Sequence, residues 1–174
     1  MAEDGGGGSR GEGRGEAALP PASRRVAAAA RGLGLPIEIV EMPESTRTAE
    51  EAARACGCGV GQIVKSLVFR GTRSGKAPLL LVSGVNRVDP DRAEAAAGEP
   101  LERPDAAYVR DVTGFAIGGI PPFGHASEMT VIVDPDLLDH DLVWAAAGTP
   151  RTVFAVSPRT LAAALGAPVL PLAS

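Results

Sequence analysis

After a polar N-terminal stretch, the chain alternates short apolar runs with polar segments that carry helix caps or turn residues. Ser23 precedes an alanine-rich run and predicts a helix over Arg24–Leu33, with its hydroxyl as the cap. Thr48 and Glu51 have the spacing of a capping box, in which each side chain satisfies a free backbone donor of the other residue. A second helix is therefore predicted from this box to the residue before Gly57.

Two β-prone runs, Val64–Arg70 and Leu79–Ser83, are separated by the polar stretch Gly71–Lys76. The glycines of this stretch favour a hairpin connection, so the two runs are predicted to pair antiparallel. The remaining pattern predicts a strand over Ile37–Val40, helices after the caps Asp89, Asp105 and Ser157, and strands over Phe115–Ile117, Thr130–Val133 and Thr152–Val156. This alternation with at least one hairpin indicates an α/β (α+β) fold, with a mixed sheet flanked by helices.

Composition separates a tail from a folded domain. Residues 1–21 are dominated by Gly, Glu and Arg and contain almost no side chain that could be buried, so ordering them would cost entropy without return. We therefore expect residues 1–21 to be a disordered Gly-rich tail and residues 22–174 to form one domain. A chain of 174 residues, 45% of them hydrophobic, needs neither disulfides nor a structural metal to hold its core together.

The charge balance limits which partners the whole molecule can attract. Seventeen basic residues against 21 acidic ones give a formal net charge of −4, so the protein as a whole is not an electrostatic trap for polyphosphate. Aromatic residues make up only 3% of the chain, which leaves few rings on which bases could stack. We therefore expect no DNA binding, and any RNA contact must be local.

Cys56 and Cys58 are separated by one residue, a spacing that suits neither an ordinary disulfide nor a zinc site of four ligands. Both fit reduced thiols of the cytosol. No run of the sequence approaches the roughly 20 apolar residues of a membrane span. The first 18 residues also lack the apolar centre of a signal peptide. These features predict a cytoplasmic protein with no membrane partner.

Lys65 is an unusual residue within its predicted strand. Strand alternation places Lys65, Leu67 and Phe69 on one face, so the lysine shares that face with two large apolar side chains. A lysine is seldom fully buried unless it is paired, so one interpretation is an ammonium at the wall of a pocket that receives an anionic or carbonyl-bearing ligand. The other is a lysine whose stem lies on the sheet while its head reaches solvent, and the strand alone favours this second interpretation.

Three glycines and two prolines fall within the eight residues from Gly118 to His125. Glycines let a ligand approach the backbone and expose N–H groups, whereas prolines fix the path of the loop. Such a loop can form a backbone site for a carbonyl or an oxyanion without a catalytic side chain. A plain structural crossover explains the same composition, and the loop alone does not decide between the two.

His125 is the only histidine near this loop, and it is either a general base or a structural residue, the more frequent role of a lone histidine. Neither Ser66 nor Ser83 lies in a Gly-x-Ser-x-Gly turn, so nucleophilic catalysis is poorly supported. The segment Asp134–Asp136 predicts a turn and a cap rather than a metal site. No glycine-rich loop has the spacing of a phosphate-binding motif, and we expect no metal and no nucleotide cofactor.

Taken together, these segments resemble the YbaK/ProX family, which includes free-standing deacylases and the editing domain inserted in many bacterial prolyl-tRNA synthetases. The resemblance covers about Ala22 to Leu170. Its marks along the chain are Gly61–Phe69, then Gly118–His125 with a Gly-x-x-x-Pro loop, then Trp144–Pro150. The family implies a single domain in which a mixed, mostly antiparallel, barrel-like sheet is flanked by helices.

The resemblance implies hydrolysis of the ester that joins a wrong amino acid to the 3′ end of a tRNA, chiefly proline tRNA that carries alanine or cysteine. The partners are then the aminoacyl-tRNA 3′ end and prolyl-tRNA synthetase. In such enzymes the terminal hydroxyl of the tRNA or a bound water supplies the reactive oxygen, which agrees with the lack of a catalytic triad. Some inserted editing domains use a histidine near the segment matching Ala145–Gly148, where this chain has none, and that difference favours a free-standing branch.

On this resemblance, Lys65 holds the tRNA terminus or the substrate, and Gly118 and Gly119 present backbone donors to the aminoacyl carbonyl; these three residues form the expected catalytic set. The substrate-binding residues expected around them are Pro122, His125, Ser83, Asn86 and Gly148. Two other functions remain open. One is a non-catalytic module that binds aminoacyl-tRNA or a synthetase through the same pocket, and the other is a hydrolase of another small aminoacyl ester.

Overall fold

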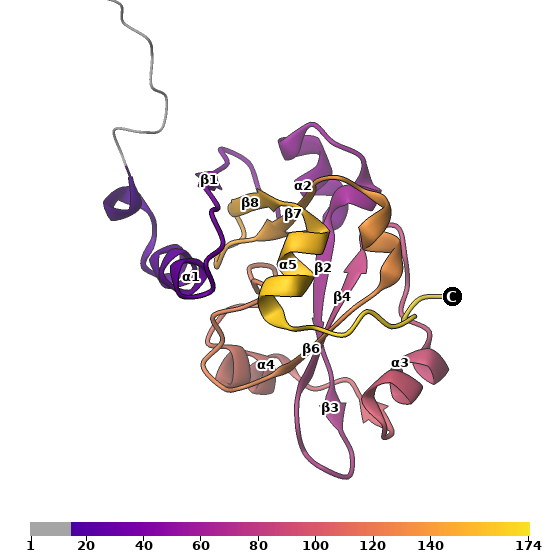
Figure 1. The fold of residues 1–174 in the computed structure, drawn as a ribbon. Coiled ribbons are helices and arrows are strands. Elements are labelled where there is room, and N and C mark those ends of the chain that lie inside the picture. Colours follow the sequence, from indigo (N-terminus) through magenta and orange to yellow (C-terminus); the bar gives the residue numbers. More distant parts are fainter. Residues whose placement is uncertain (1–14) are drawn as a thin grey trace, which may run out of the picture.

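Three sheets hold the strands of residues 15–174, the part of the chain that the computed structural model describes (Figure 1). In the first sheet, β1 (Ile39–Glu41), β8 (Thr152–Val156) and β7 (Val143–Ala146) follow in this order and pair antiparallel. In the second, the order is β2 (Val64–Val68), β4 (Pro78–Ser83) and β6 (Thr130–Val133), with β2 antiparallel and β6 parallel to β4. A two-stranded sheet of β3 (Arg70–Gly71) and β5 (Leu101–Glu102) lies beyond the end of β2.

This arrangement confirms the predicted mixed, mostly antiparallel α/β fold. The predicted hairpin is the β2–β4 pair, in which Lys65 lies opposite Val82. Among the described residues the strands do not close into a barrel; the two larger sheets pack against each other instead. Leu79 and Leu81 of β4 meet Phe154 of β8 and Val143 of β7 in the main core.

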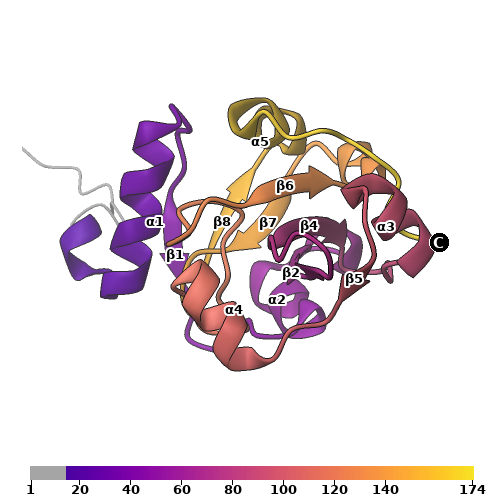
Figure 2. The ribbon, with the colours of Figure 1, turned by 90° about the horizontal axis from the view of Figure 1, so that it is seen from below.

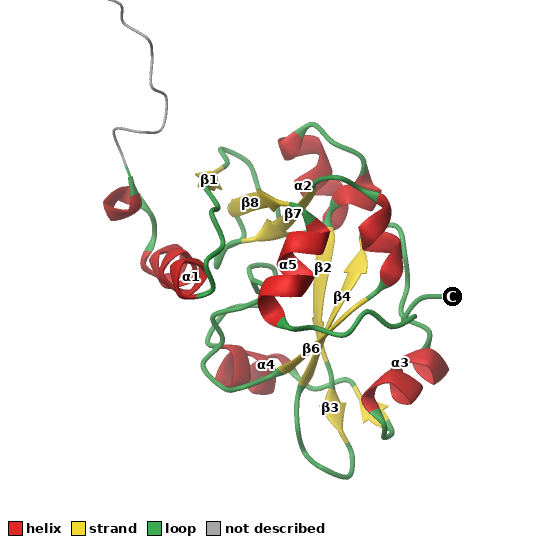
Figure 3. Cartoon of the chain, in the orientation of Figure 1, coloured by secondary structure: helices red, strands yellow, loops and turns green. Residues whose placement is uncertain are grey.

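Five α-helices surround the sheets in the described part of the chain: α1 (Pro21–Gly32), α2 (Ala49–Cys56), α3 (Pro90–Ala97), α4 (Ala106–Thr113) and α5 (Pro158–Leu165). Short 3₁₀ helices occur at η1 (Glu16–Ala18), η2 (Val60–Gln62) and η3 (Pro135–Asp139). Figure 2 shows α5 and α2 on opposite sides of the strands, and Figure 3 distinguishes the helices from the connecting loops. None of the helices of residues 15–174 has the length and apolar character that a membrane span requires.

Local signals for helix starts are confirmed at four of the predicted caps. The Glu51 amide donates to Thr48 Oγ1 at 3.1 Å while the Thr48 amide donates to Glu51 Oε1 at 3.3 Å, which is the reciprocal capping box. Asp89, Asp105 and Ser157 accept amide hydrogen bonds at the starts of α3, α4 and α5. These contacts involve residues within one turn of each other, so the sequence alone specifies them.

The first helix starts earlier than predicted. Pro21 is already the first residue of α1, because proline at this position lacks only an N–H that would have no partner there. Ser23 is therefore not the cap; its buried hydroxyl donates to Thr152 Oγ1 at 2.9 Å and ties α1 to β8. Of the predicted tail, residues 1–14 lie outside the described residues, and residues 16–18 form η1, so the division at residue 21 stays a prediction.

The predicted strand Phe115–Ile117 is wrong. These residues form a turn after α4, where the Phe115 amide donates to Thr113 Oγ1 at 3.0 Å and Thr113 Oγ1 also lies 3.1 Å from the Phe115 carbonyl. The hydrogen-bonding groups of Phe115 are therefore used by the helix end and not by a strand neighbour. A strand was missed over Val143–Ala146, where alanines carry little strand signal in the sequence.

Both faces of the second sheet are covered. One face of β4, with Leu79 and Leu81, looks into the main core, and the other, with Leu80 and Val82, packs against Ala93 of α3. This double coverage explains why β4 is apolar at nearly every position. The alternation predicted for β2 is confirmed as well: Val64 and Val68 belong to the main core, whereas Leu67 and Phe69 belong to the α3 side. Lys65 lies on that second face, by the same alternation.

Candidate active site between two sheets

A cavity of about 320 Å³ lies where the open edge of β2 meets β7. The two sheets touch at this place through a single parallel bridge between Ile63 and Trp144. The lining comes from residues 46–49 with Ala52, from 63–67, from 117, 118 and 120, and from the β7–β8 hairpin through 144–146 and Val153. Four separate parts of the chain therefore build the cavity, and among them are Lys65 and Gly118, two of the three residues predicted to be catalytic.

The ammonium of Lys65 is held in place by backbone. Lys65 Nζ donates to the carbonyl of Asn86, in the loop that follows β4. Burial lowers the pKa of Lys65; the carboxylate of Glu50 counteracts this shift, and the cations of Arg87 and Arg103 reinforce it. Because Lys65 is only half-buried, its amine keeps access to the cavity. Lys65 is thus a positioned cation at a pocket wall, as one of the two interpretations of the sequence predicted.

Gly118 and Gly119 differ in what their backbone can offer. The Gly119 amide donates to Ala116 at 3.0 Å, and its carbonyl accepts the Gly148 amide at 2.9 Å, so both groups are in use. Gly118 lines the cavity with φ of +97°, a conformation that favours glycine, and its N–H has no backbone acceptor among the described residues. Of the two predicted loop donors, Gly118 is therefore the one whose N–H has no backbone acceptor among the described residues, and the Gly148 amide binds within the loop; their roles toward a substrate stay predictions.

The edge strand β2 turns backbone groups of Ser66 toward the cavity. The Gly84 amide donates to Ile63 and the Phe69 amide donates to Pro78, at 2.8 and 3.0 Å. In an antiparallel pair such bonds join alternate residues, so the odd-numbered residues of β2 bond with β4 and the N–H and C=O of Ser66 point away from it. The side chain of Ser66 also lines the cavity, and its buried hydroxyl has no partner among the described residues.

Pro122 and His125 line a different cavity, of about 390 Å³, between the end of α1 and the loop before β6. His125 Nε2 donates to the Pro121 carbonyl at 2.7 Å. Burial lowers the pKa of His125, and the bond to Pro121 only partly counteracts this shift. A neutral imidazole bound within its own loop fits the structural interpretation of His125 rather than the general base, and neither residue reaches the cavity that contains Lys65.

Ser83 and Asn86 are not among the described residues that line the cavity. Ser83 Oγ is buried and donates to the Gly61 carbonyl at 2.8 Å. Asn86 Nδ2 donates to Asp136 Oδ2 at 2.7 Å, while its backbone carbonyl accepts the Lys65 ammonium. Both were predicted to bind substrate, but the structure gives their side chains partners within the protein.

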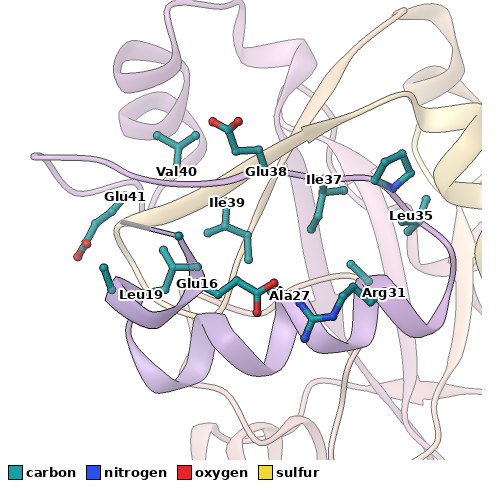
Figure 4. Close-up of a pocket in the computed structure, with 14 residues that line it drawn as sticks. Glu16, Leu19, Ala27, Arg31, Leu35, Ile37, Glu38, Ile39, Val40 and Glu41 are labelled. Atoms are coloured by element: carbon teal, nitrogen blue, oxygen red, sulfur yellow. Dashed lines mark hydrogen bonds and ion pairs between the residues drawn. The ribbon is translucent and has the colours of Figure 1, made fainter. Parts of the chain in front are cut away.

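A larger cavity, of about 530 Å³, lies between α1 and the extended segment Leu35–Glu41 (Figure 4). Its floor is aliphatic, with Ile37 and Ile39 pointing toward α1, and an ion pair between Arg31 and Glu16 lies beside it. None of the residues predicted for the site lines this cavity. We therefore place the candidate active site in the smaller cavity.

The described residues offer neither a metal centre nor an activated thiol. Within residues 15–174, no three His, Cys, Asp or Glu side chains come close enough together to hold a metal ion. Cys56 and Cys58 are unbridged, and burial raises the pKa of Cys56 to about 11, so its thiol stays protonated at neutral pH. The chemistry available in the cavity is therefore that of the Lys65 ammonium, the Arg47 guanidinium, side-chain hydroxyls and backbone groups.

Comparison with known proteins agrees with this geometry. The sequence profile of the aminoacyl-tRNA editing domain matches residues 43–164, which include every segment that lines the cavity. The chain belongs to the aminoacyl-tRNA editing domain family. The resemblance to YbaK/ProX deacylases inferred from the sequence motifs is thereby confirmed.

Relatives of this editing domain are found among solved structures and curated sequences. A protein proposed to be a trans-editing enzyme for prolyl tRNA synthetase is 50% identical, with a TM-score of 0.84 over 90% of this chain and 99% of that one. The hypothetical protein APE2540 is 29% identical, with a TM-score of 0.81 over 86% of this chain and 99% of that one. The uncharacterized protein YwhH of Bacillus subtilis (strain 168) is 29% identical over 124 residues, which are 71% of this chain and 78% of that protein.

Three lining residues of the editing domain were not assigned to the site from the sequence. Trp144, the single tryptophan of the chain, was noted only as part of a family motif, and Arg47 carried no signal at all. Ser66 was considered only as a nucleophile, because a sequence does not reveal that a hydroxyl lacks a partner. Ser66 of β2 and Trp144 of β7 reach the cavity where the two sheets meet, and Arg47 comes from the loop before α2. No local pattern specifies that these segments lie together.

Proposed function

We propose that this editing domain acts in trans as a hydrolase that removes a wrongly attached amino acid from tRNA, with alanyl or cysteinyl esters of proline tRNA as its substrates. The observation that supports this proposal is that Lys65 and Gly118, whose N–H has no backbone acceptor among the described residues, line one cavity in which no described residue is a nucleophile activated by a base. A donor at the carbonyl stabilises the oxyanion that forms during ester hydrolysis. The attacking oxygen then comes from water or from the terminal hydroxyl of the tRNA.

The size of the cavity supports a small amino acid. A volume of about 320 Å³ must hold both the aminoacyl group and part of the terminal ribose. Its lining includes the buried side chains of Ile63 and Ile120, so a larger side chain would meet branched aliphatic groups. Because a synthetic site rejects a smaller amino acid by only about 1–3 kcal/mol per methylene, a second site that excludes larger ones provides the missing discrimination.

Three arginines around Lys65 support contact with the phosphates of a tRNA end. Arg47 lines the cavity, and Arg87 and Arg103 act electrostatically on Lys65. The ion pairs of residues 15–174 involve Arg31 and Arg70 instead, so these three guanidinium groups are not neutralised by a carboxylate contact there. In a chain with a formal net charge of −4, this local group of cations restricts RNA contact to the mouth of the cavity.

Trp144 gives the same mouth an aromatic surface. Its indole is half-buried and lines the cavity beside Ile63 and Ala145. Unpaired bases of single-stranded RNA ends commonly stack on aromatic side chains, and the terminal adenine is the base nearest to the ester. We place the adenine on Trp144, the aminoacyl group inside the cavity and the adjacent phosphates among the arginines. The mischarged tRNA is released by prolyl-tRNA synthetase in the cytoplasm, where this chain would meet it.

A panel of aminoacyl-tRNAs tests the proposal. Wild type and Lys65→Ala are incubated side by side with alanyl-, cysteinyl- and prolyl-tRNA for proline and with correctly charged alanyl-tRNA, and the remaining ester is measured over time. We expect wild type to deacylate a mischarged proline tRNA and Lys65→Ala to be inactive while its circular dichroism is unchanged. Equal rates for the two proteins would refute the role of Lys65.

Binding measured on the same tRNAs separates the hydrolase from a non-catalytic module. Trp144 is the single tryptophan, so its fluorescence reports occupancy of the cavity directly. Quenching by aminoacyl-tRNA without loss of the ester would identify a binding module. Turnover of an ester outside the proline tRNA set would identify a hydrolase with a different substrate.

A further inference from the structure

The buried hydroxyl of Ser66 has no hydrogen-bond partner among the described residues. Among the buried side-chain nitrogen and oxygen atoms of residues 15–174, Ser66 Oγ is the one that has no partner. An unsatisfied buried hydroxyl destabilises the folded state, so such a group requires an explanation. Its position in the lining of the candidate active site suggests that the partner is a ligand.

The other hydroxyls of the cavity are already engaged. Thr46 Oγ1 donates to the Pro150 carbonyl at 2.9 Å, and Thr48 Oγ1 accepts the Glu51 amide as the cap of α2. The charged groups of the lining, Arg47 and Lys65, are donors, and no described residue that lines the cavity carries a carboxylate. The cavity is therefore well supplied with donors and poor in acceptors.

Ser66 supplies two acceptors from one residue. Its hydroxyl projects from the face of β2 that carries Val64 and Val68, while its backbone carbonyl lies in the plane of the sheet and points to the open edge. The two oxygens thus approach the cavity from different directions at the same position of the strand. A group with several N–H donors fits such a pair better than a carbonyl does.

We propose that Ser66 binds the free α-amino group of the aminoacyl ester, with Oγ and the backbone carbonyl as the acceptors. This inference rests on the proposed function and specifies its substrate as an ester with an unblocked α-amine. It leaves the Gly118 N–H for the ester carbonyl and Lys65 for the tRNA end. Ser66 is a positioning residue, because its contact is to the substrate's amine and not to the bond that breaks.

The contact between Ser66 and the α-amino group is tested by comparing two proteins on two substrates. Wild type and Ser66→Ala are compared on proline tRNA charged with alanine and on the same tRNA charged with propionate, in which hydrogen replaces the α-amino group. We expect Ser66→Ala to lower kcat/KM for the alanyl ester about ten-fold, the usual effect of one lost hydrogen bond to a charged or strongly polar group. On the propionyl ester the two proteins should be equally fast. Equal losses on both substrates, or no loss on either, would overturn the proposal.

Stability measurements separate this role from a structural one. Since the Ser66 hydroxyl has no partner, Ser66→Ala should leave the Tm unchanged or raise it, and Ser66→Thr, which keeps the hydroxyl, should recover part of the activity on the alanyl ester. Ser83→Ala is the matched control, because it removes a buried hydroxyl that does have a partner and should lower the Tm. A lowered Tm for Ser66→Ala would show a structural hydroxyl and contradict the inference. Failure of wild type to hydrolyse either ester would instead refute the proposed function.

Discussion

Lys65 and Asn86 are joined by a hydrogen bond from the lysine ammonium to the backbone carbonyl, across the turn that ends β4. The carbonyl fixes where the charge sits without neutralising it, because a carbonyl is not an anion. Burial lowers the pKa of the lysine, yet Lys65 stays exposed enough to meet a ligand. An anion entering the cavity would therefore encounter a cation that is already oriented.

Replacing this cation should affect activity more than stability. Lys65→Met keeps most of the apolar stem over Leu67 but removes the charge, so we expect the free energy of unfolding to change by less than about 1 kcal/mol. Deacylation of mischarged tRNA should fall by at least about ten-fold, since hydrogen bonds to charged groups contribute about 1.5–3 kcal/mol. Lys76→Met, in the exposed β3–β4 connection, is the control and should retain full activity. A Lys65→Met protein that is unfolded by circular dichroism would contradict this assignment.

The two loop glycines should respond differently to alanine. A Cβ on Gly119 would lie 2.7 Å from the backbone nitrogen of Thr149, so Gly119→Ala must separate the loop from the β7–β8 turn and should cost about 1–3 kcal/mol of stability. A Cβ on Gly118 would lie 2.8 Å from Cγ of the flexible Arg47 side chain, which can move. Gly118→Ala strains the positive φ of this residue by about 1–2 kcal/mol but meets only this movable side chain, so it should be the milder change for stability.

For activity we expect the opposite order: per molecule of folded protein, Gly118→Ala should lose more activity than Gly119→Ala. Gly118→Ala strains a backbone at positive φ and disturbs a loop segment that lines the cavity, so kcat should fall at temperatures where the protein is fully folded. Urea unfolding combined with single-turnover deacylation measures both effects. A Gly118→Ala protein with wild-type kcat would exclude its N–H from the reaction.

The arginines near Lys65 should determine how salt affects catalysis. If Arg87 and Arg103 each neutralise one phosphate, each substitution by glutamine should reduce the slope of log kcat/KM against log salt concentration by about 0.7–0.9. The expected change is in KM, with kcat preserved. Arg159→Gln on α5, on the other side of the strands from α2, should leave the slope unchanged. If all three variants have the same slope, Arg87 and Arg103 do not contact phosphates of the tRNA.

His125 should make the protein less stable in acid. Its pKa is lowered in the folded state by burial, below the value of about 6.5 for an unfolded chain. As the pH falls below 6.5, the unfolded chain binds a proton that the folded protein does not, so the free energy of unfolding decreases in this range. The stability is fully present above pH 6.5. Urea unfolding at pH 7.5 and 5.5 should show a smaller difference for His125→Gln than for wild type, with His140→Gln as the control.

Features set by neighbouring residues were predictable from the sequence. Thr48 and Glu51 form their capping box within a single helical turn. The short polar stretch Gly71–Lys76 strongly favours antiparallel pairing of β2 with β4. Lys65 was placed on the correct face of its strand by alternation alone. In each case the partners lie close enough along the chain for a local pattern to specify the contact.

Features set by tertiary contacts could not be predicted from the sequence. Phe115 has the composition of a strand residue, but the hydroxyl of Thr113 binds its backbone and ends the helix there. The role of Gly119 could not be predicted either, because its close approach to Thr149 depends on a turn thirty residues away in the sequence. Among the residues that line the cavity, Lys65 and Gly118 were assigned to the site because a motif marks them, whereas residues that only packing brings there were not assigned.

The cavity lies between two sheets, each with its own hydrogen bonds, that meet at the bridge from Ile63 to Trp144. Its width therefore depends on the distance between the sheets as well as on the residues that line it. That distance is determined in part by the core between them, where Leu81 packs with Phe154. A larger or smaller side chain in this core changes which amino acid fits while every residue of the cavity stays the same, so substrate range can diverge between relatives whose active sites look identical.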